Sequence, residues 1–191
     1  GIRLMYALFL DALAALRLRF HPAEHYRYNP AVILGALLVV GAINAAAMAP
    51  LFGSHTGAVA FGVALTVLKW AVLSAIMAKV LHYYGAPEMQ LYGFIAMTEL
   101  LAAPLIAMLY WPQHLGLVGT LWQAWIFVVQ IIGLTRLSGQ SGLKVLLGYL
   151  AYFIILMLAG SLLLMIFNAM GWLDIQALAA EMQKITQTPQ P

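Results

Sequence analysis

The sequence contains no cysteine and very few charged residues. Without cysteine there can be no disulfide, thiolate metal site or cysteine nucleophile, and the redox compartment cannot be read. Charged residues make up 8% of the chain and hydrophobic residues 64%, whereas a soluble domain carries about 25% charged residues. The solvent for most of this chain must therefore be lipid. The formal net charge of +3 is too small to indicate nucleic-acid binding, and we expect no nucleic-acid partner.

Five apolar runs are long enough to cross a bilayer, which requires about 20 residues in a helix. The runs are continuous rather than alternating, so they do not resemble the strands of a membrane barrel. Backbone groups in lipid must be paired within the segment, and this requires helices. We therefore predict an all-α fold, a polytopic membrane helical bundle with five transmembrane helices, in one domain over residues 1–191. The expected spans are 31–52, 57–81, 91–110, 115–134 and 143–170.

The segments on either side of these spans, 1–29 and 171–191, differ from them. Residues 2–20 form an apolar stretch that is short for a span and contains Asp11 midway. We interpret it as a short N-terminal interfacial helix on the cytoplasmic side, the alternative being a short or half-buried span. After the last span, Asp174 can cap an external amphipathic helix that continues to Ile185. Residues 186–191 are expected to be a disordered tail.

Lys and Arg residues alternate between the two sides of the predicted bundle. They occur before the first span and near the loops after the second and fourth spans, and they are absent from loops 52–56 and 111–114. Because positively charged loops stay in the cytoplasm, we expect a cytoplasmic N-terminus and a C-terminus on the outer side of the membrane.

Lys69 in the second span and Glu99 in the third are the most informative residues. Charges deep in a bilayer are rare and usually face a partner or a cavity. At 1.5 Å per residue, Glu99 lies about 13 Å and Lys69 about 18 Å from the inner ends of their helices. A lysine side chain can cover the difference, so we predict a buried Lys69–Glu99 ion pair. This pair could fix the helix register or form a proton, ion or lipid-headgroup site, or the two residues could have different partners.

Small residues recur every fourth position in the first span, at Gly41, Ala45 and Ala49, next to Asn44. Such a face lets another helix approach closely. We expect this contact inside the bundle, with Asn44 hydrogen-bonding across helices, rather than with a separate subunit. Pro104 lies five residues after Glu99 and is a candidate kink in the third span.

Motifs that could indicate chemistry are weak in this chain. Residues 139–142 spell Gly-Gln-Ser-Gly, as in rhomboid proteases, but a serine nucleophile needs a histidine base on a later helix, and the last histidine is His114. His21 and His25 have a spacing typical of metal ligands on a helix, but Pro22 would break that helix. We therefore predict no catalytic residues, no cofactor and no metal.

Several segments resemble the Yip family, the membrane domain of proteins that interact with Ypt/Rab GTPases. The resemblance covers roughly residues 19–165. It includes Arg19-Phe20-His21-Pro22, the stretch YYGAPEMQLYGFIAMTELLAAPLIAML at 83–109, and SGQSGLKVLLGYL at 138–150. It implies five spans, a cytoplasmic N-terminus and no enzyme activity, as in a bacterial-type short member. Such a member implies a bacterial inner membrane as the location, with the C-terminus in the periplasm. The long cytosolic region and acidic segment of eukaryotic members are missing, so we do not expect a Rab-type GTPase as partner.

Two function hypotheses follow. The first is a non-enzymatic scaffold or accessory subunit of a larger complex, with membrane lipids and other integral membrane proteins as partners. The second is a small transporter or a lipid/quinone-binding subunit that uses the Lys69–Glu99 region. An intramembrane enzyme is a third and weaker alternative.

Overall fold

The structure, a computed structural model, describes residues 2–187 and contains no strand within them. Five helical segments are long and apolar enough to span a membrane. They are α2 (Pro30–Phe52), α3 (Thr56–Tyr83), a third segment over Tyr92–Tyr110, α6 (Pro112–Ser138) and α7 (Gly142–Ala169). The prediction of an all-α bundle with five such helices is confirmed, and the chain is an integral membrane protein.

Six further short elements complete the description of residues 2–187. Two precede α2, three follow one another along the third span, and one follows α7. They are α1 (Ile2–Leu16), η1 (Ala23–Tyr26), α4 (Tyr92–Glu99), η2 (Leu100–Ile106), α5 (Ala107–Tyr110) and α8 (Ile175–Gln187), where η marks a 3₁₀ helix.

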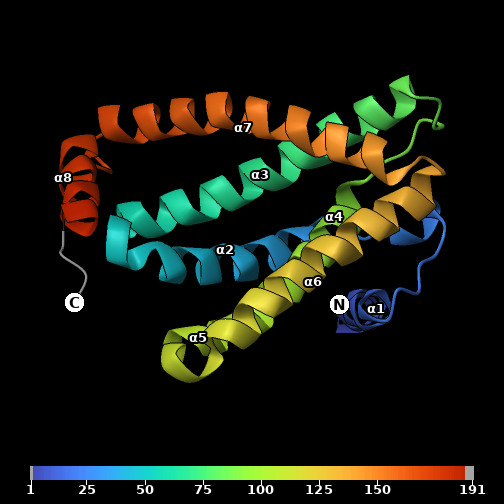
Figure 1. Cartoon of the computed structure of the whole chain (residues 1–191), viewed down its shortest axis with the longest axis horizontal. Helices are drawn as coiled ribbons and strands as arrows, with labels where there is room; N and C mark the ends of the chain where they lie inside the picture. The colour runs from blue at the N-terminus through green and yellow to red at the C-terminus, as the bar shows by residue number, and fades with distance from the viewer. Residues whose placement is uncertain (1, 188–191) are drawn as a thin grey trace.

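The five spans run alternately up and down, so the connections lie at two ends of the bundle (Figure 1). The α1 end carries residues 17–29, 84–91 and 139–141, and the α8 end carries residues 53–55, 111 and 170–174. Arg17, Arg19, Arg27 and Arg136 all lie at or near the α1 end. Within the described residues, the α8 end has one basic residue besides histidine, Lys184 of α8. The unequal distribution of Lys and Arg residues among the predicted loops therefore corresponds to a difference in positive charge between the two ends of the bundle.

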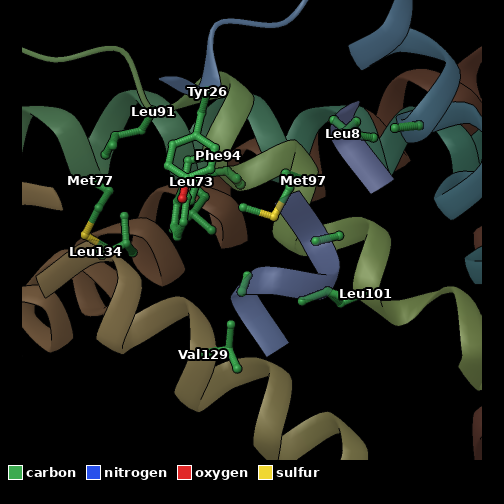
Figure 2. Close-up of a cluster of buried hydrophobic side chains, with 14 of the residues drawn as sticks. Leu8, Tyr26, Leu73, Met77, Leu91, Phe94, Met97, Leu101, Val129 and Leu134 are labelled. Atoms are coloured by element: carbon green, nitrogen blue, oxygen red, sulfur yellow. The ribbon is translucent and has the colours of Figure 1, made fainter. Parts of the chain in front are cut away.

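The helices are packed most tightly in the half of the bundle that lies near α1. Here α4 is surrounded, since it contacts α1, α2, α3 and α6, and its residues Gly93–Thr98 are all buried. Figure 2 shows Phe94, Met97 and Leu101 of this central segment among apolar side chains of α1, α3 and α6. Towards α8 the spans separate, and a smaller cluster joins Ala58 and Phe61 to Phe167 and Leu173. In lipid, helices associate by such close packing because the hydrophobic effect between them is lost.

Helix α1 is seen end-on in Figure 1, while α2, α3 and α7 run across the picture. It therefore lies crosswise to these spans. Its buried residues Leu8, Ala12 and Ala15 pack into the main core, and most of its other apolar side chains, such as Phe9 and Leu13, are exposed. At 15 residues it is shorter than a span. This arrangement is the one expected of an interfacial helix, with additional contacts to α4 and α6.

The small-residue face of α2 is used inside the chain. A Cβ atom added at Gly62 of α3 would lie 2.8 Å from the Ala45 Cα atom, and one at Gly41 would lie 3.0 Å from the Val63 Cα atom. The Asn44 side-chain amide donates a hydrogen bond of 2.9 Å to the Thr66 hydroxyl group on α3. The α2–α3 contact thus combines backbone proximity with one polar bridge, as we expected for this face.

Three expected boundaries are wrong. The fourth span starts at Pro112 rather than at 115, because proline is well placed in the first turn of a helix, where its missing N–H group is not needed. The same span ends at Ser138 rather than at 134. Only Trp111 then separates α5 from α6. Helix α8 includes Thr186 and Gln187, which we had assigned to the disordered tail. The rest of that expected tail, 188–191, lies outside the described residues.

Candidate functional site in the membrane-spanning segments

The candidate site is a group of polar side chains from four spans around Glu99. Glu99 is the last residue of α4 and is partly buried. It lies about 10 Å inside its helix from Tyr92, and Gln130 of α6 and Tyr149 of α7 lie at similar depths from the same end. These residues meet because α6 packs against both α4 and α7, which lie on either side of it in the chain, near the α1 end (Figure 1).

Gln130 connects the polar side chains of this site. Its buried side-chain amide group donates to the Thr98 hydroxyl group at 3.0 Å and to a Glu99 carboxyl oxygen at 3.4 Å. Its amide oxygen accepts a hydrogen bond from the Tyr149 hydroxyl group. One side chain therefore joins the third, fourth and fifth spans, and it satisfies polar groups that would be costly to leave unpaired in lipid.

Lys69 does not form the direct ion pair with Glu99 that we predicted. No nitrogen–oxygen distance between them is within 4.0 Å, although their charges interact electrostatically. Lys69 lies about 21 Å along α3 from Tyr83, and therefore deeper than Glu99. Its side chain does not close that difference, and Glu99 bonds to Gln130 instead.

Both charged groups keep bonding capacity. Among residues 2–187, the Lys69 ammonium group makes no hydrogen bond or ion pair, and one Glu99 oxygen accepts none. Lys69 is partly buried, as Glu99 is. Two tyrosines of α7, Tyr149 and Tyr152, lie close enough to Glu99 for their phenol groups to interact with it electrostatically. The site thus offers a cation, an anion and phenol groups to a polar molecule.

Pro104 lies where we expected a kink, and the structure has a longer disturbance there. The α-helix ends at Glu99, and residues Leu100–Ile106 form the 3₁₀ helix η2. A 3₁₀ run of this length is uncommon, since its hydrogen bonds have poorer geometry. The consequence for the site is that Glu99 lies at the junction between α-helix and 3₁₀ helix.

The sequence indicated Glu99 and Lys69 but did not indicate Gln130 or Tyr149. Both were passed over because we searched the spans for charges, and neither residue is charged. Their depth in the membrane could have indicated them. Gln130 lies 8 residues before the end of α6 and Glu99 lies 7 residues after the start of α4, so the two residues are at similar distances from the same end of the bundle. No protein-family model, curated protein or solved structure matches the chain.

Proposed function

We propose that this chain is a non-enzymatic accessory subunit of a larger membrane complex and that its Lys69–Glu99 region binds the polar head of a lipid or quinone. The observation that carries the proposal is that a lysine and a glutamate lie within two spans that pack together, yet form no direct ion pair. An ionisable residue inside a membrane is costly and is usually retained for a function. A pair that served only to fix the helix register would be in contact.

The chemistry of the site suits a headgroup with acceptor and donor atoms. The Lys69 ammonium group can donate to a phosphate or a quinone carbonyl oxygen, since it has no other partner in the described chain. The free oxygen of Glu99 can accept from an amine or a hydroxyl group.

The proposed setting is a bacterial inner membrane with the α1 end in the cytoplasm. The Arg residues near the α1 end support this orientation. The resemblance to a bacterial-type short member of the Yip family stays a prediction, and it agrees with a non-enzymatic role that involves no Rab-type GTPase.

Native mass spectrometry of the gently solubilised protein tests the bound molecule. We expect one lipid or quinone per chain in the unmodified protein and at least about tenfold lower occupancy in Lys69→Met and Glu99→Gln, since a charged hydrogen bond contributes about 1.5–3 kcal/mol. Lys79→Met and Glu88→Gln are matched controls because these residues lie near the α1 end, outside the site. Equal occupancy in all variants would contradict the proposal.

A scaffold without a ligand is the second candidate, and one observation favours it. Only 6% of the residues in the most apolar stretch of α7 are buried, against 39% in the third span. Helix α7 packs mainly along α3 and leaves most of its surface to lipid or to another membrane protein. The scaffold function is supported if the purified protein contains a partner protein but no lipid or quinone. The Lys69 and Glu99 variants should then retain that partner.

A further inference from the structure

Asp11, His21 and His25 come together at the α1 end, outside the membrane-spanning segments and apart from the Glu99 site. Each residue offers one ligand atom, and these atoms all lie within 4.8 Å of one another. The Nε2 atom of His25 lies 2.9 Å from the Oδ1 atom of Asp11. The two imidazole rings are stacked, with centroids 4.0 Å apart.

The backbone brings the histidines together without the helix that their spacing would require. Helix α1 ends at Leu16, and Leu18, two residues later, has a φ of 59°, which turns the chain back. The short helix η1 then follows Pro22, and the N–H group of His25 donates to the Pro22 carbonyl group at 3.0 Å. Pro22 therefore excludes an α-helix, as the sequence indicated, but the turn it begins places His25 over His21.

A second layer of residues orients these three side chains. The Tyr28 hydroxyl group donates to the Oδ2 atom of Asp11 at 2.5 Å, which leaves Oδ1 facing the histidines. The backbone N–H group of His21 donates to the hydroxyl oxygen of Tyr26, which is buried. Metal ligands are commonly held by such outer partners.

We propose that Asp11, His21 and His25 bind a divalent transition-metal ion of the zinc class, with water completing the coordination. Two imidazoles and one carboxylate suit Zn²⁺, which accepts nitrogen and oxygen ligands at about 2.0–2.2 Å. The His21 ring makes no hydrogen bond within residues 2–187 and is exposed, so its nitrogen atoms are free to bind.

Binding requires a small rearrangement of exposed groups. The rings are inclined by 26°, so the His21 ring must turn before its nitrogen and that of His25 point at one ion. The ion then replaces the hydrogen bond between His25 and Asp11. Because Asp11 belongs to α1 and the histidines precede α2, the ion ties α1 to the segment that leads into the bundle, and its binding free energy stabilises that contact.

Zn²⁺ titration of the full chain in mild detergent, with any histidine tag removed, tests the site. Calorimetry should give one ion per chain, and Zn²⁺ should raise the unfolding temperature. His21→Ala and His25→Ala should each weaken binding at least about tenfold, and Tyr28→Phe should weaken it less. His82→Ala and His114→Ala, which remove histidines elsewhere, should leave the affinity unchanged.

His21→Ala is the decisive variant because the ring makes no hydrogen bond that the fold would lose. If this variant folds normally and binds Zn²⁺ as tightly as the unmodified chain, the proposed site is wrong. The absence of stoichiometric binding by the unmodified chain would also contradict the proposal. The outcome is independent of the lipid or quinone measurement, since the two sites share no residue.

Discussion

The indole nitrogen of Trp122 on α6 donates a hydrogen bond of 2.9 Å to the carbonyl group of Leu101 in η2. In a 3₁₀ helix, that carbonyl group would accept from the N–H group three residues later. The residue three positions later is Pro104, which has no N–H group. Trp122 thus supplies the donor that proline removes, and a side chain of the fourth span stabilises the break in the third.

This relationship predicts that Trp122→Phe destabilises the protein by about 1–3 kcal/mol, since a buried carbonyl group loses its partner. The loss should be smaller in a Pro104→Ala background, because an N–H group then becomes available at position 104. Thermal unfolding of the four proteins in one detergent measures the coupling. Strictly additive losses would contradict the role assigned to Trp122.

The contact between α2 and α3 predicts a large difference between two glycines. Gly62→Val should destabilise the bundle by about 1–3 kcal/mol or more, because the added atoms meet the backbone at Ala45. Gly35→Val on α2 is the matched control, since nothing lies within 4 Å of a Cβ atom there. Similar unfolding temperatures for the two variants would contradict the packing described for this pair of helices.

The polar site predicts a ranking of its residues for stability. Gln130→Met should destabilise more than Lys69→Met, because Gln130 makes three hydrogen bonds to three residues and Lys69 makes none in the described chain. The difference should be about 1–3 kcal/mol in thermal or denaturant unfolding. A larger loss for Lys69→Met would indicate that Lys69 has the structural role instead.

The proposed orientation predicts a labelling pattern, and a chain without cysteine is well suited to the test. Ser54→Cys and Gln183→Cys, at the α8 end, should react with an impermeant thiol reagent on intact cells. Glu88→Cys lies in an exposed loop at the opposite end and should react only after the membrane is opened. The reverse pattern would invert the orientation.

The number and approximate limits of the spans could be predicted because hydropathy and chain length decide them almost alone in lipid. Which side chains meet could not, since contacts depend on the rotation and crossing of each helix. Lys69 and Glu99 illustrate this, as depth along the helices suggested a pair that the packing keeps apart. Asp11 was assessed only as an interruption of an apolar stretch, so its approach to His25 was missed.

Gln130 also restricts how α6 can move. A slip of this helix by one residue shifts its side chains by 1.5 Å and turns them by about 100°. Such a step would withdraw one amide from Thr98, Glu99 and Tyr149 together. Sliding of the fourth span along its neighbours is therefore opposed, because all three hydrogen bonds would be lost together.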